Sequence, residues 1–128
     1  MTNMKSFLII LAAVLLGILI LFARGAGQTD TAPAHNVSME NGTQIVEIRA
    51  KGGFSPRKST AKAGVPTIVR FETSGTFDCS SSIRIPSLGV NRIIPQSGST
   101  DIDIGTGQVG TLQGTCGMGM FPFEIDFL

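Results

Sequence analysis

The sequence has no tryptophan or tyrosine, only one histidine, two cysteines and few charged residues. Charged residues make up 15 % of the chain and the formal net charge is +1, so we expect no nucleic-acid partner, which would need a basic stripe. The sequence also shows no acid–base pair and no nucleophile beside a base, so we do not expect an enzyme. The histidine, His35, lies in a segment without periodicity, ahead of the patterned part of the chain.

The length and the glycine content favour one β-rich domain with a tail. A chain of 128 residues is too short for two ordinary domains. Its 16 glycines are typical of many turns, because glycine weakens the interior of a helix.

The N-terminal segment carries an uncharged, apolar run from Phe7 to Ala23, between Lys5 and Arg24. Its length lies between that of a signal-peptide core and that of a membrane-spanning helix. We predict an uncleaved, single-pass signal anchor in residues 1–24, with the rest of the chain outside the cytoplasm. The alternative is a cleaved signal peptide and a secreted or periplasmic protein.

The rest of the chain divides into a predicted flexible linker, residues 25–42, and a folded domain, residues 43–128. The linker is rich in small and polar residues. In the domain, short alternating runs recur roughly every ten residues, as in an antiparallel sandwich or barrel. The clearest predicted strands are Gln44–Arg49, Thr67–Phe71, Thr76–Ile85, Thr100–Ile104, Thr111–Cys116 and Phe123–Phe127. In the last of them, phenylalanine and isoleucine alternate with Glu124 and Asp126.

Sulfur is concentrated in Cys116-Gly117-Met118-Gly119-Met120, and the only other cysteine is Cys79. A sandwich gathers its loops at two ends, so the two sites are able to meet. Thiolate and thioether ligands select Cu(I) over hard cations. A blue-copper site needs two histidines and a structural zinc site four Cys or His ligands, so neither fits this domain.

Two alternatives without a metal remain open for the same residues. Cys79 and Cys116 would form a disulfide in an oxidising compartment, closing a loop of about 37 residues and adding roughly 3 to 4 kcal/mol of stability. Met118 and Met120 would then be ordinary apolar filler. The metal and disulfide interpretations are compatible, because two close thiols oxidise reversibly.

A series of short motifs in the domain resembles the cupredoxin-like, or plastocyanin-like, domains that occur alone or fused to copper-transporting ATPases. In chain order these motifs are Gly53-Phe54-Ser55-Pro56, Ala63-Gly64-Val65-Pro66, Cys79, Ile85-Pro86-Ser87-Leu88-Gly89-Val90, Gly110-Thr111 and Cys116 to Met120. The resemblance implies a Greek-key β-sandwich with copper at one end. It places Cys79 where plastocyanin-type proteins carry an isolated histidine ligand, and Cys116 at their ligand cysteine.

We therefore predict an all-β, Greek-key sandwich preceded by one hydrophobic helix. We expect it to bind copper, as Cu(I), through Cys79, Cys116, Met118 and Met120, for copper handling or delivery. The expected partners are the copper ion, a copper transporter or copper-accepting protein, and the membrane through the helix, with the protein a monomer. The rival functions are a one-electron carrier and a disulfide-stapled binding module without metal.

Overall fold

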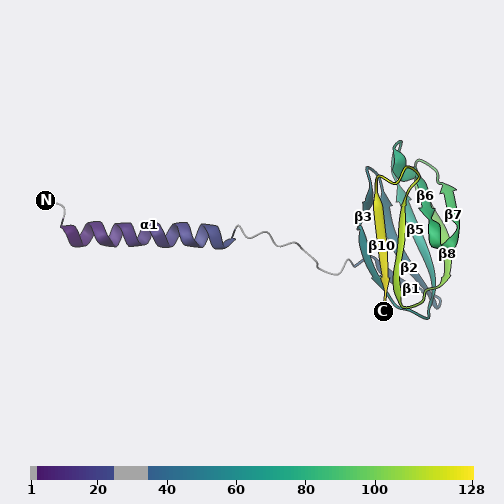
Figure 1. Cartoon of the computed structure of the whole chain (residues 1–128), viewed down its shortest axis with the longest axis horizontal. Helices are drawn as coiled ribbons and strands as arrows, with labels where there is room; N and C mark the ends of the chain where they lie inside the picture. Colours follow the sequence, from purple (N-terminus) through teal and green to yellow (C-terminus); the bar gives the residue numbers. More distant parts are fainter. Residues whose placement is uncertain (1–2, 25–34) are drawn as a thin grey trace. The chain divides into compact units, whose positions relative to one another are not determined.

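The computed structural model describes residues 3–24 and 35–128. It contains one helix, α1 (Met4–Arg24), and a β-domain, which are separate compact units (Figure 1). Large apolar side chains are exposed along the helix from Met4 to Ile20. Within the described ranges, no helix combines the length and the apolar character needed to cross a membrane.

The paired strands of the domain begin earlier in the chain than residue 43, the predicted start of the domain. Strand β1 (Val37–Glu40) lies inside the segment predicted as a linker and pairs with β2 (Thr43–Ala50). The side chain of Asn36 donates hydrogen bonds to the carbonyl of Glu47 and to Ser59 Oγ, both at 2.8 Å, which ties the start of β1 to the domain. The remaining predicted linker residues, 25–34, lie outside the described residues.

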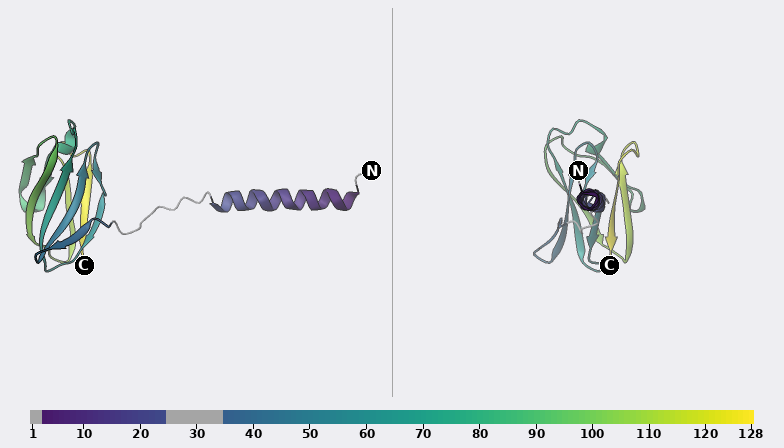
Figure 2. Two further views of the ribbon diagram at one scale, coloured as in Figure 1. Left: turned by 180° about the vertical axis from the view of Figure 1, so that it is seen from behind. Right: turned by 90° about the vertical axis from the view of Figure 1, so that its left-hand side faces the viewer.

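Two five-stranded sheets make up the domain. Figure 2 shows them as two layers of a sandwich. The first sheet has the order β1-β2-β5-β8, with β3 added to β2. Besides β1 and β2 it contains β3 (Phe54–Ser55), β5 (Pro66–Thr73) and β8 (Gly98–Thr106). The second sheet has the order β4-β10-β9-β6-β7. Its strands are β4 (Lys58–Ala61), β6 (Ser82–Ile85), β7 (Val90–Ile93), β9 (Gly110–Cys116) and β10 (Pro122–Phe127).

The predicted all-β sandwich is confirmed, but it is not wholly antiparallel. Strand β2 runs parallel to β5, and β4 runs parallel to β10. Parallel neighbours need crossover connections, and here these connections pass from one sheet to the other. The chain crosses from β3 in the first sheet to β4 in the second and returns to the first with β5.

The core lies between the sheets and centres on three phenylalanines. Phe54, Phe71 and Phe123 pack edge to face, with ring centroids 4.9 to 5.9 Å apart. Gly114 makes room for this cluster, because a Cβ atom on Gly114 would collide with the ring of Phe123. The alternation predicted for the last strand is confirmed, since Ile125 and both phenylalanines of that strand are buried.

Candidate functional site

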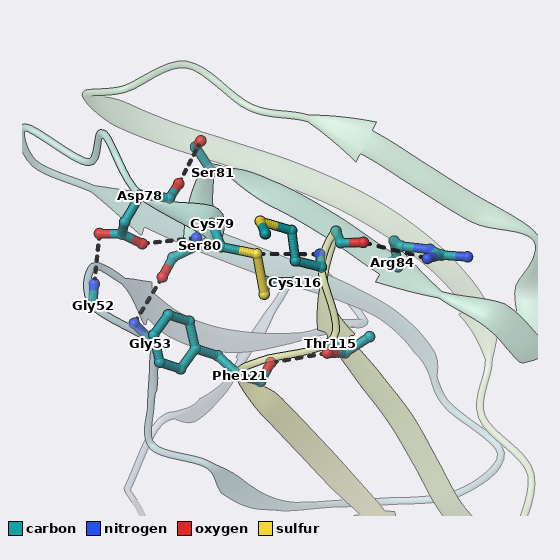
Figure 3. Close-up of a disulfide and its surroundings, with 12 residues drawn as sticks. Gly52, Gly53, Asp78, Cys79, Ser80, Ser81, Arg84, Thr115, Cys116 and Phe121 are labelled. Carbon is teal, nitrogen blue, oxygen red and sulfur yellow. Dashed lines mark hydrogen bonds between the residues drawn. A yellow bond between two sulfur atoms is a disulfide. The ribbon is translucent and has the colours of Figure 1, made fainter.

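The candidate site begins at Cys79, on the short 3₁₀ helix η1 (Cys79–Ser81), where the sequence predicted a continuous strand. Asp78 caps this helix, and its carboxylate accepts hydrogen bonds from the N–H groups of Ser80 (2.8 Å) and Gly52 (2.9 Å). The buried hydroxyl of Ser80 accepts another from the N–H of Gly53 at 2.7 Å (Figure 3). These bonds fix the helix that carries Cys79 against the turn between β2 and β3.

Hydrogen bonding also sets the charge state of Asp78. The hydrogen bonds from Ser80, and then the one from the Gly52 N–H, lower the pKa of the Asp78 carboxyl because they stabilise its ionised form. Asp78 is therefore a carboxylate at neutral pH, and it remains on the surface beside the cysteine.

Cys116, the second cysteine, ends strand β9 and is completely buried. It lies opposite Ile83 of β6, and its backbone N–H donates to the carbonyl of Phe121 at 3.0 Å. The carbonyl of Cys116 accepts a bond from the N–H of Gly119 at 2.9 Å, which closes a tight turn. The position of Cys116 is thus set by a paired strand, whereas the residues after it form a turn.

The methionine loop, residues 117–121, depends on its two glycines. Gly119 has a φ of 74°, a left-handed conformation that glycine adopts without steric cost. Gly117 lies against β6, where its N–H donates to the carbonyl of Ser82 at 3.0 Å. A Cβ atom on Gly117 would lie 2.5 Å from Ser82 Oγ, so a larger residue here would push the loop away from the sheet.

The fold brings the two cysteines together as a disulfide between η1 and the end of β9 (Figure 3). The cysteines are 37 residues apart in sequence, and their Cα atoms are 5.5 Å apart. The backbone N–H of Met118 donates to Cys79 Sγ at 3.3 Å, so the methionine loop contacts the bridge through its main chain. The predicted meeting of Cys79 and Cys116 is confirmed, and it takes the oxidised form.

The two methionine side chains are not enclosed with the cysteines. Met118 is 78 % exposed and Met120 is 62 % exposed, so neither is the core filler considered as an alternative. They share the loop that follows Cys116, but their side chains lie at the surface. The structure thus bonds the two cysteine sulfurs to each other and leaves the two methionine side chains exposed to solvent.

Histidine does not complete the site. His35, just before β1, is exposed. Across residues 3–24 and 35–128, no three His, Cys, Asp or Glu side chains gather closely enough to hold a metal. Among the described residues, sulfur is concentrated in the cysteine pair and the methionine loop.

Sequence reasoning missed the residues that support the cysteines, chiefly Asp78, Ser80 and Ser82. Only Asp78 left a signal, because Asp is a favoured N-cap residue whose carboxylate accepts a backbone N–H two or three residues later. The contacts of Ser80 with Gly53 and of Ser82 with Gly117 join distant parts of the chain, and nothing local predicts them.

Comparison with known proteins identifies relatives of the whole β-domain. The family model described as a cupredoxin-like domain matches residues 11–124. No curated protein matches the chain in sequence.

Two solved structures share the fold. One is the crystal structure of the metal-binding domain of the Streptococcus pneumoniae D39 Cu(I)-exporting P-type ATPase CopA, with Cu(I). It is 24 % identical with a TM-score of 0.64, and the match covers 72 % of this chain and 92 % of that one. The other is the solution structure of a copper-binding protein in its apo form, 25 % identical with a TM-score of 0.65, covering 72 % and 94 %.

Proposed function

This chain belongs to the family of cupredoxin-like domains, and on that premise we propose that it binds copper as Cu(I) through Cys79 and Cys116 in their reduced form. The observation that carries the proposal is the pairing of these cysteines, since it places the only two thiol sulfurs of the chain side by side. Two proteins of the same fold support the proposal: the metal-binding domain of a Cu(I)-exporting ATPase, solved with Cu(I), and a copper-binding protein, solved in its apo form.

The proposed binding requires that the disulfide first be reduced. Two electrons and two protons convert the bridge into two thiols, and Cu(I) then displaces the protons to bind two thiolates. Burial disfavours an isolated thiolate at Cys116, so the positive ion is needed to hold both sulfurs ionised. Copper affinity should therefore rise with pH through the titration of the thiols.

Met118 and Met120 complete the proposed site as thioether ligands, giving three- or four-coordinate copper. Their position supports this role, because both lie on the loop that follows Cys116, and the N–H of Met118 contacts Cys79 Sγ. Thioethers are neutral, so they add soft coordination without adding charge to a site that already holds two thiolates.

The proposed role is copper handling or delivery outside the cytoplasm by a monomeric, non-catalytic domain. A structural disulfide is typical of oxidising compartments, which supports the location. Delivery would be to a copper transporter or a copper-accepting protein, and exposed thioether ligands beside a buried thiolate are suited to passing an ion across a surface. A one-electron carrier is disfavoured, because the described domain offers no pair of histidines.

The disulfide itself favours a second candidate, a stapled binding module without metal. Anaerobic competition titration with a Cu(I) chelator distinguishes the two functions. We expect the reduced protein to bind Cu(I), and the oxidised protein and the double variant Cys79→Ser, Cys116→Ser to bind far more weakly. If the reduced wild type binds no better than the double variant, the copper function is wrong and the stapled module stands. An intense visible thiolate-to-Cu(II) band with a reversible potential would favour electron transfer instead.

A further inference from the structure

The two sulfurs of the disulfide differ in their access to solvent. Cys116 is completely buried beneath the sheet, whereas Cys79 is partly exposed on the short helix η1. On the solvent side of Cys79 the neighbours are open, since Met118 and Phe77 are each 78 % exposed, whereas Ser80 on its other side is buried. A reagent approaching from solvent therefore meets Cys79 before Cys116.

Thiol–disulfide exchange requires a thiolate to reach one of the two sulfurs directly. We propose that the bridge is opened by an external dithiol, such as a protein with two neighbouring cysteines, which attacks Cys79 and not Cys116. In this step a bond forms between the attacking sulfur and Cys79 Sγ. The bond between Cys79 and Cys116 breaks, and Cys116 leaves with the electron pair and takes up a proton.

The position of Cys116 explains why a dithiol is needed. After the first step Cys116 stays close to Cys79, because β9 and η1 hold their Cα atoms 5.5 Å apart. Its effective concentration is therefore high, and it displaces a single external thiol and closes the bridge again. A dithiol avoids this return, because its own second thiolate attacks the mixed disulfide from within the partner.

That second attack releases Cys79 as a thiolate, and the methionine loop assists the release. The N–H of Met118 donates to Cys79 Sγ at 3.3 Å, so it stabilises negative charge on this sulfur. The full exchange transfers two electrons and two protons from the dithiol to the protein. The partner is left with a disulfide and this domain with two thiols.

The proposed exchange involves only the disulfide and an external dithiol, so it can be tested without copper and independently of the proposed copper binding. The full chain is oxidised, freed of metal and mixed with a thioredoxin-type dithiol protein whose second cysteine is replaced by serine. That replacement removes the partner's second attack, and quenching at early times traps the mixed disulfide before Cys116 displaces the partner and closes the bridge again. After acid quenching, proteolysis and mass spectrometry locate the bond. We expect it on the peptide that contains Cys79, and a bond to Cys116 would overturn the proposal.

A second measurement compares the two thiols separately and does not depend on a protein partner. Cys116→Ser leaves only the Cys79 thiol, and Cys79→Ser leaves only the Cys116 thiol. With a coloured aromatic disulfide as the probe, we expect Cys79 to react at least about tenfold faster, because access limits the buried thiol. Equal rates, or a faster Cys116, would contradict the proposed direction of attack. Should either variant fail to fold, the mapping on the wild-type chain decides.

Discussion

The cysteine pair (Cys79 and Cys116) and the methionine loop supply the sulfur of the proposed copper site, yet the protein holds them in opposite ways. Cys116 is fully buried at the end of a paired strand, and Cys79 is fixed by a capped 3₁₀ helix. Met118 and Met120 project from a glycine turn into solvent. The cysteines of the proposed site are therefore held by the folded core, whereas the two thioethers lie in solvent on a loop that is tied to the core by main-chain hydrogen bonds and by the side chain of Phe121.

The cysteine pair and the methionine side chains should therefore contribute differently to stability and to metal binding. Changes to the cysteine pair should affect both folding stability and metal binding, because the same atoms serve both. Changes to the methionine loop side chains should affect metal binding alone, because burial contributes little there. The predictions below are ordered by the size of the expected effect.

The largest effect is expected from Cys116→Ser. Removing the bridge should lower the free energy of unfolding by about 3 to 4 kcal/mol, because the denatured chain regains the freedom of a 37-residue loop. Denaturant unfolding measures this, with reduced wild type as the control. The reductant should destabilise the wild type by a similar amount and leave the variant unchanged. A variant as stable as the oxidised wild type would show that the bridge does not support the fold.

A substitution in the core beneath β9 should lower the free energy of unfolding by almost as much. Gly114→Ala places a methyl group in the ring of Phe123, and overpacking of this kind costs about 1 to 3 kcal/mol. The neighbouring, exposed Gln113 offers a matched control, and Gln113→Ala should change the unfolding free energy by less than about 0.5 kcal/mol. Equal effects from the two substitutions would mean that the strand carrying Cys116 is less tightly packed than the structure indicates.

Substitutions of the loop methionines should weaken Cu(I) binding and leave the stability of the fold unchanged. Met118→Leu and Met120→Leu keep the size of the side chain but remove the thioether, so the unfolding free energy should change by less than about 0.5 kcal/mol. Cu(I) affinity should fall by roughly tenfold for each methionine that binds the ion, equivalent to about 1.4 kcal/mol. Met39→Leu, at an exposed methionine on β1, is the control and should leave affinity unchanged. If neither loop variant weakens binding, the methionines are not ligands.

The smallest effect is expected from the cap on η1. Because the folded-state pKa of Asp78 is lowered, its ionised form stabilises the protein above the unfolded pKa of about 3.9, and this stability is lost as the pH falls through the folded pKa. Asp78→Ala should cost about 0.5 to 1 kcal/mol at neutral pH. The difference from wild type should shrink under acid, as measured by unfolding at pH 7 and below pH 4. A difference that stays constant with pH would exclude the carboxylate as its source.

The sequence predicted the fold well where apolar residues alternate strongly. Phe123, Ile125 and Phe127 predicted the last strand and its buried face, and the structure confirms both. Strand β4 was missed, because its buried residues are the small Ser59 and Ala61, which give no hydrophobic alternation. The parallel pairs β2–β5 and β4–β10 were missed as well, because the local sequence pattern of a strand does not indicate which distant strand it pairs with.

The sequence pointed to the residues of the candidate site, but it did not predict how the fold arranges them. Two cysteines near loops of a sandwich predicted that they could meet, and the disulfide confirms it. The sequence did not predict that Cys116 is buried while Met118 is exposed. That difference depends on the turn at Gly117 and its contact with Ser82, which only the folded chain brings together.

X-ray absorption at the copper edge tests the central claim most directly, on the full chain reduced and loaded with one equivalent of Cu(I). The account predicts the edge of reduced copper and a first shell made only of sulfur, with the sulfur signal weakened in the double variant Cys79→Ser, Cys116→Ser, which keeps only the thioethers. A first shell of nitrogen or oxygen, or a spectrum that is unchanged in the double variant, would contradict it.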